Sequence, residues 1–174
     1  FPKYAYKSPS ALKVNPKPNV DVTIGNKTRL PHNLVAFQYD IQIQPYFQAP
    51  GVTFDSSKDQ TFDGFTRVQF QMLESAYSVA LDVYNLTIMS AVLYKGSTRQ
   101  QLVSADYDNS ANRITLVPVF FLQPNQNYTI EMTYSGKIMD DVSGGLYRSI
   151  YTFPNGTQGA VYATHFETFP DQYG

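Results

Sequence analysis

The sequence predicts an all-β domain of antiparallel strands, arranged as a β-sandwich or as saddle-shaped sheets. Short segments that alternate between apolar and polar residues recur along most of the chain, and turn residues separate them about every 8–12 residues. The composition agrees, because 14 tyrosines and 12 phenylalanines favour strands while good helix formers are sparse. No segment of about ten residues or more shows the period of an amphipathic helix.

Length and composition indicate one folded domain, or one domain with a tail, in 174 residues. With 43% hydrophobic and 16% charged residues, the chain is too apolar and too weakly charged for intrinsic disorder. It contains no apolar run of the roughly 20 residues that span a bilayer, and its net charge of −1 argues against nucleic acid as a partner. Since there is no cysteine, no disulfide, thiol nucleophile or cysteine-ligated zinc site can form.

The first 28 residues are expected to form an extended arm, with one short edge strand over 20–24. Four prolines lie among the lysine, serine and asparagine residues of this arm, and proline favours extended, solvated chain. Residues 29–174 are expected to form a single β domain. Its first strand is predicted over 34–44, where every second residue from Phe37 to Ile43 is apolar, and Pro45 should end or bend it.

The remaining elements follow from the same alternation and from turn residues between them. A polar loop is expected over 49–61. Further strands are predicted over 65–73, 78–83, 86–94, 101–107 and 112–122, around Tyr128–Tyr134, and over 145–153 and 159–166. Pro154-Asn155-Gly156 separates the last two runs, and Asn-Gly between alternating segments predicts a hairpin.

One core is expected on the apolar faces of these strands. Its predicted members are Phe37, Tyr39, Ile41, Ile43, Val68, Phe70, Val79, Leu81, Val83, Ile130 and Met132.

Several common catalytic motifs are absent from the sequence. The chain has no G-x-S-x-G, no phosphate loop and no H-E-x-x-H. Its two histidines, His32 and His165, lie far apart, and a zinc enzyme usually needs three protein ligands. We therefore predict no catalytic residue, no metal site and no cofactor. His32 is interpreted as a surface residue, and the acidic run at 140–143 as a solvated turn, because its spacing does not fit a calcium loop.

His165 and Glu167 form the candidate binding site. Alternation along a strand places both side chains on one face. The simplest interpretation is an ordinary polar strand face, and a functional one needs support from elsewhere.

Four N-x-S/T sequons are candidate N-glycosylation sites. Their asparagines are Asn26, Asn85, Asn127 and Asn155. A chance origin in a chain rich in asparagine and threonine is the alternative, but together with the lack of cysteine and the low Lys and Glu content they favour an extracellular protein, either secreted or on the cell surface.

Five motifs in order give the chain a resemblance to a known family. They are Arg29-Leu30-Pro31 with the strand from Tyr39 to Pro45, Phe62-Asp63-Gly64, Leu86-Thr87-Ile88, Tyr128 to Ile138, and Gly145-Leu146-Tyr147-Arg148-Ser149-Ile150-Tyr151. This series, from about 29 to 169, resembles the N-terminal domain of the aminopeptidase N family of zinc metallopeptidases. The resemblance implies a β-rich saddle domain that packs, in the whole enzyme, on a thermolysin-like catalytic domain.

The resemblance also bears on the site. The catalytic domain of that family brings H-E-x-x-H, a further glutamate ligand and a catalytic tyrosine, and zinc belongs there. The family carries Gln and Glu in a segment where this chain has His165-Phe166-Glu167, and the glutamate helps to hold the free amino terminus of the substrate. Here the glutamate is kept, the glutamine is histidine, and the following arginine-containing stretch is missing.

Three functions follow as expectations. The first is a secreted or cell-surface, non-catalytic module that binds an extracellular protein or peptide. The second is an excised N-terminal domain of an active zinc ectoaminopeptidase, contributing to the pocket for the substrate amino terminus. The third is an adhesion or carbohydrate-binding sandwich whose motif matches are accidental.

Overall fold

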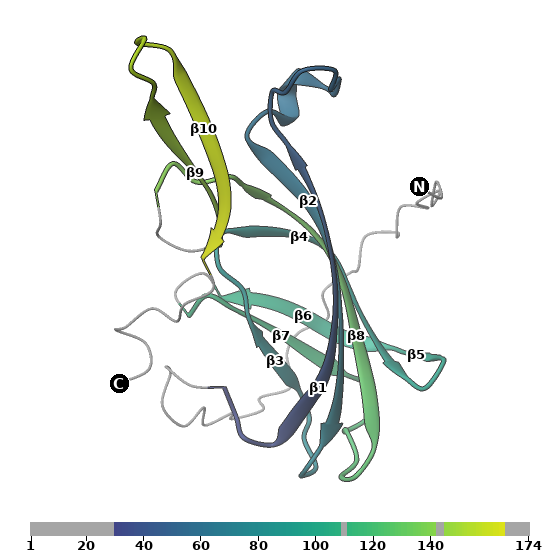
Figure 1. Ribbon diagram of the computed structural model, residues 1–174. Helices are drawn as coiled ribbons and strands as arrows, with labels where there is room; N and C mark the ends of the chain where they lie inside the picture. The colour runs from purple at the N-terminus through teal and green to yellow at the C-terminus, as the bar shows by residue number, and fades with distance from the viewer. Residues whose placement is uncertain (1–29, 109–110, 142–144, 166–174) are drawn as a thin grey trace.

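The computed structural model describes residues 30–108, 111–141 and 145–165, and it consists almost entirely of β-strands (Figure 1). Apart from one 3-10 turn, η1 (Ser56–Lys58), no helix occurs in these ranges. The strands are β1 (Leu34–Tyr46), β2 (Thr61–Met72), β3 (Val79–Asp82), β4 (Leu86–Lys95), β5 (Thr98–Gln100), β6 (Leu102–Asp108), β7 (Arg113–Pro118), β8 (Asn127–Lys137), β9 (Gly145–Thr152) and β10 (Gln158–His165). The predicted fold class is confirmed. The arm expected over 1–28 lies outside the described residues.

The strands form two sheets and a separate hairpin, and all strand pairs are antiparallel. The larger sheet has the order β1-β2-β8-β4-β5, and the smaller has the order β3-β7-β6. The smaller sheet forms a second layer beside the long strands, and the β9–β10 hairpin projects away from both (Figure 1). The core lies between the sheets. Its most deeply buried members are Phe70, Met72, Leu93, Leu116, Leu122 and Ile130.

The register shows which face of the larger sheet looks toward this core. Tyr39 lies opposite Val68, Val68 opposite Ile130, and Ile130 opposite Leu93. Residues directly opposite one another in antiparallel strands share a face. This row therefore runs along the inner face from β1 to β4, and its last three members are almost completely buried.

The structure differs from the predicted core at the edge strand β1. Tyr39, Ile41 and Ile43 are on the inner face, but they remain 60%, 57% and 45% exposed. Phe37 falls at the register shift between Ala36 and Gln38 and is also exposed. The start of β1 packs against the core through Leu34 and Ala36, but within the described residues the smaller sheet does not cover the strand from Tyr39 to Ile43. The alternation therefore predicted the face correctly, and the predicted burial of these residues is wrong. We call Tyr39, Ile41 and Ile43 the uncovered row.

The other predicted core residues are buried, with one exception. Val68, Phe70, Val79, Val83, Ile130 and Met132 are buried. Leu81 is only half-buried and packs against the rim of the core. Pro45 does not end β1, which continues to Tyr46. A strand at a sheet edge has a partner on one side only, so it tolerates a residue without an amide hydrogen.

Two glycines make room for aromatic rings between the paired strands β2 and β8. Phe62 lies opposite Gly136, and Gly64 lies opposite Tyr134. Each ring lies over the glycine of the other strand, and a Cβ added to either glycine would run into it. The Tyr134 hydroxyl also pairs with the Thr66 hydroxyl at 2.8 Å. Glycine is therefore required at both positions by close approach of a side chain.

The β9–β10 hairpin is attached to the larger sheet at its base. The Tyr162 ring stacks on Phe47, with ring centroids 4.0 Å apart. Its hydroxyl accepts a hydrogen bond of 3.1 Å from the Gln60 side-chain amide. The Arg148 guanidinium donates from Nε and Nη2 to Asp140 at 3.0 and 2.5 Å. These contacts fix where the hairpin leaves the sheet, while the rest of it stands in solvent.

Candidate protein-binding surface

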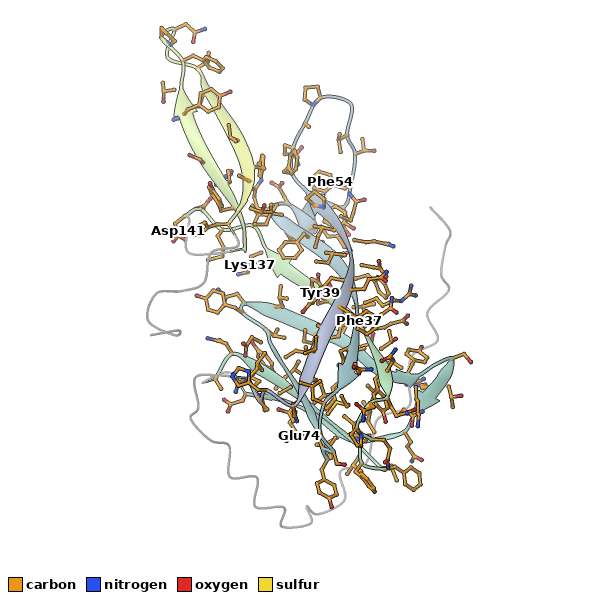
Figure 2. All side chains as sticks on the ribbon, turned by 60° about the horizontal axis from the view of Figure 1, so that its bottom comes forward. Phe37, Tyr39, Phe54, Glu74, Lys137 and Asp141 are labelled. Carbon is orange, nitrogen blue, oxygen red and sulfur yellow. The ribbon has the colours of Figure 1, made fainter. Side chains whose placement is uncertain are left out.

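The uncovered row differs from an ordinary protein surface because its three large side chains are exposed on the face that is buried in the next strand. Its three side chains follow one another on one face of β1, whereas Gln38, Gln42 and Gln44 mark the other face. Figure 2 shows Phe37 and Tyr39 next to each other along β1. Contiguous apolar side chains of this kind mark interaction sites more often than scattered ones do.

A groove continues the uncovered row between β1 and β3. It holds a cavity of about 110 Å³, lined on one side by Leu34, Ala36 and Tyr39 and on the other by Val79 and Leu81. Among the described residues that line it, none has a charged side chain. The groove is therefore suited to an uncharged, apolar group.

A charged cluster lies on the opposite face, at the far end of β1. The Tyr46 hydroxyl donates to Asp63 Oδ2 at 2.8 Å, Lys58 forms an ion pair with the same carboxylate, and the Lys58 ammonium lies 4.6 Å from the centre of the Tyr46 ring. Burial opposes ionisation of Asp63, but the hydrogen bonds from Lys58 and Tyr46 outweigh it and lower the pKa of the carboxyl. The hydrogen bond to Asp63 likewise raises the pKa of Lys58. This cluster ties η1 to the sheet and offers no open site.

Two loops at the other end of the molecule expose a second group of apolar side chains. A β-bridge between Ala76 and Leu122 joins these loops, and the Tyr77 and Phe121 rings lie 6.1 Å apart. The exposed members are Leu73, Tyr77, Val119, Phe120 and Phe121.

The predicted site residues are only partly described. His165 ends β10 opposite Gly145 and is half-buried, whereas Glu167 lies outside the described residues. Their shared face, and their role in binding, therefore stay predictions. His32 is exposed, as predicted. Within 30–108, 111–141 and 145–165, no group of three or more His, Cys, Asp or Glu side chains could hold a metal ion. The same ranges contain no helix with the length and apolar character to cross a bilayer.

Three of the four sequons can be located. Asn85, Asn127 and Asn155 are exposed, and Asn26 lies outside the described residues. Asn155 is in the turn between β9 and β10, as the Asn-Gly signal predicted.

Comparison with known proteins supports the resemblance. The sequence model of the peptidase M1 N-terminal domain matches residues 35–171, which is most of the chain. This chain belongs to the peptidase M1 N-terminal domain family. It is 35% identical over 145 residues to "Putative aminopeptidase-2" of Caenorhabditis elegans, and 26% identical over 164 residues to "Aminopeptidase N" of Haemonchus contortus.

The alignments cover most of this chain but little of either relative. They include 82% and 87% of this chain, and 8% and 17% of the respective relatives. The motif matches that the third expectation treated as accidental therefore reflect family membership. Two of these motifs, Phe62-x-Gly64 and Tyr134-x-Gly136, are the pair of reciprocal ring-on-glycine contacts between β2 and β8.

The sequence analysis did not predict that the uncovered row, the groove and the second group of exposed apolar side chains lie on the surface. Alternation in β1 looks the same whether its apolar face is covered or not, so no local signal distinguishes the two. The pair Phe120-Phe121 did carry a signal, because neighbouring residues of a strand cannot both face one core.

Proposed function

We propose that this M1 N-terminal domain is a non-catalytic module that binds another protein through the uncovered row and the adjoining groove. The observation that supports it best is the exposure of Tyr39, Ile41 and Ile43 on the same face that is buried in the next strand. Leaving apolar area in water is unfavourable by about 25 cal/mol per Å², so a partner that covers this row gains the corresponding free energy.

The size and lining of the groove support a protein partner over a small molecule. A cavity of about 110 Å³ is well below the roughly 300–1,000 Å³ of sites that enclose drug-sized ligands. It suits a single aliphatic side chain. The flat row beside it suits further apolar side chains of the same partner. The expected partner is therefore an apolar protein surface or an extended peptide, presented outside the cell.

A secreted or cell-surface location is part of this proposal. Its support is that the three sequons within the described residues all expose their asparagine. The module is proposed to act without zinc, because the chain has no H-E-x-x-H segment.

A second candidate follows from the length of the relatives. Because this chain corresponds to only 8% and 17% of them, the surface that covers the uncovered row could belong to the rest of a longer aminopeptidase. In that case the domain is the N-terminal part of a zinc ectoaminopeptidase, and Glu167 and His165 contribute to the pocket for the substrate amino terminus.

Peptide selection tests the first candidate. The purified domain is immobilised and panned against a phage-displayed library of random peptides. We expect enrichment of peptides with apolar residues at alternate positions, because these can lie along a strand. Binding should be lost in the triple variant Tyr39→Ser, Ile41→Thr, Ile43→Thr.

A matched variant controls for damage to β1. Gln38→Thr, Gln42→Thr and Gln44→Thr change three residues on the other face of the same strand, and this variant should bind as the wild type does. No enrichment, or peptides that bind all three proteins equally, would contradict the proposal.

A chimera distinguishes the second candidate. The domain replaces the matched N-terminal segment of the Haemonchus contortus aminopeptidase N. If the second candidate is right, the chimera loses activity when it carries the triple variant but not when it carries the glutamine variant. If the first is right, both variants leave the chimera equally active.

A further inference from the structure

The tip of the β9–β10 hairpin is a fully formed turn. β9 ends at Thr152 and β10 begins at Gln158. The Phe153 amide donates to the Thr157 carbonyl at 2.8 Å, and the Gly156 amide donates to the Phe153 carbonyl at 2.9 Å. Gly156 has a φ of +84°, which only glycine adopts without strain. The turn therefore holds the sequon Asn155-Gly156-Thr157 in one bent conformation.

Within this turn, the two side chains that define the sequon are joined to each other. The Thr157 hydroxyl donates to Asn155 Oδ1 at 2.7 Å, and the Thr157 amide donates to the same oxygen at 3.0 Å. Both bonds end on Oδ1, so neither uses Nδ2, the atom to which a glycan is attached. Both side chains are exposed.

The sequon at Asn127 is held differently. Asn127 is the first residue of β8, a central strand of the larger sheet. Thr129 lies opposite Gln69 on one side and Tyr94 on the other. A transferase cannot enclose this segment unless the strand leaves the sheet, and central strands open only at a free energy near that of global unfolding.

The sequon at Asn85 is also tied to the sheet. Leu86 packs against the core, and Leu86 and Thr87 pair with Gly136 and Ser135 of β8. By contrast, Pro154, Asn155 and Gly156 are all exposed. Phe153, which precedes them, is exposed as well, and its ring packs on Tyr151 of the same hairpin, with ring centroids 4.9 Å apart. Of the three described sequons, only that of Asn155 can be reached without opening a sheet.

We propose that Asn155 is an N-glycosylation site that can be modified in the folded domain, and that Asn85 and Asn127 cannot be modified once the domain has folded. The donor is a lipid diphosphate-linked oligosaccharide. Nδ2 forms a bond to the anomeric carbon, the bond from that carbon to the diphosphate oxygen breaks, and the lipid diphosphate leaves with the electron pair. The proton released from Nδ2 passes to a base of the transferase.

The position of the tip is compatible with the proposed protein-binding surface. The hairpin points away from the end of the molecule where β1 and β3 approach each other (Figure 1). A glycan at Asn155 would therefore leave the groove open. It would lie beside Tyr151 and Phe153, two exposed rings of the same hairpin.

Modification of the purified, folded domain tests the proposal. The domain, carrying Asn26→Gln so that the fourth sequon cannot accept a glycan, is produced in a bacterial host. It is incubated with a purified eukaryotic oligosaccharyltransferase and its lipid-linked donor, and intact mass and peptide mapping locate the glycan. We expect a single glycan, at Asn155. Synthetic peptides of the Asn85, Asn127 and Asn155 sequons should all accept the glycan, because none is held in a sheet.

Variants test whether the mass increase depends on the Asn155 sequon. Asn155→Gln and Thr157→Ala should abolish the mass increase, Thr157→Ser should retain it, and Asn127→Gln should change nothing. An unmodified folded domain alongside a modified Asn155 peptide would overturn the proposal. Glycan at Asn85 or Asn127 of the folded domain would overturn it as well.

Discussion

Gly64 and Gly136 lack a side chain at the two places where an aromatic ring of the opposite strand packs on the backbone. The Tyr134 ring fills the space above Gly64, and Tyr134 is only 7% exposed. The Phe62 ring lies in the same way above Gly136. This arrangement accounts for the spacing of aromatic residue and glycine in both strands, because the two motifs face each other in register.

We expect Gly64→Ala to lower the free energy of unfolding by about 1–3 kcal/mol, the usual effect of overpacking a well-filled core. Urea denaturation measures it. Gly159→Ala is the matched control. Its new Cβ would also meet a ring, that of Tyr151, but Tyr151 is exposed and free to turn away. Equal destabilisation by the two changes would contradict this account.

Asp63 gives the domain a defined dependence on pH. Its pKa is lowered below the ordinary value of 3.8, so its contribution to stability is present above that pH and is lost as the pH falls through the folded pKa. We expect wild type to be more stable than Asp63→Asn at pH 7, with the difference shrinking below about pH 4. Urea denaturation between pH 7 and pH 3 measures this.

Lys58→Met provides the control for that experiment. Without the ammonium group, the Asp63 carboxyl loses one of the two partners that lower its pKa. The acid-dependent part of the stability should therefore shrink in this variant. If Asp63→Asn and wild type differ by the same amount at every pH, the ion pair is not the cause.

At the scale of elements, β3 and β7 show that membership of one sheet does not imply equal burial. Leu116 of β7 is completely buried, while Leu81 of β3 is half-buried beside the groove. We expect Leu116→Ala to cost about 2–5 kcal/mol of unfolding free energy, because it leaves a cavity in the core. Leu81→Ala should cost clearly less, since its surroundings are already open. Thermal unfolding of the two variants decides this, and the reverse order would contradict the described packing.

At the scale of the whole molecule, the sequence contains no H-E-x-x-H with which to hold a zinc ion and its activated water. We predict that the 174-residue chain, with or without added zinc, hydrolyses an aminoacyl-nitroanilide no faster than buffer. An active aminopeptidase serves as the positive control. Turnover by the chain that Glu167→Ala abolishes would contradict the prediction of a non-catalytic domain.

Much of this fold could be predicted from the sequence because a strand carries its own period. Alternation and turn residues located nearly all of the strands, and Asn-Gly located the β9–β10 turn. β5 was missed, since three residues are too few to show a period. At the candidate site, the sequence found the strand that carries Tyr39 and Ile41 but not their exposure.

The sequence by itself therefore determined the all-β class, the family and which side chains share a strand face. These depend on local backbone geometry and on the order of motifs along the chain. Only the tertiary structure decided which apolar faces are covered, because burial depends on how far the second sheet extends. That sheet covers Val68 and Ile130 but leaves Tyr39, Ile41 and Ile43 in solvent. The uncovered row is thus a property of how the sheets are placed, and no pattern within β1 could have shown it.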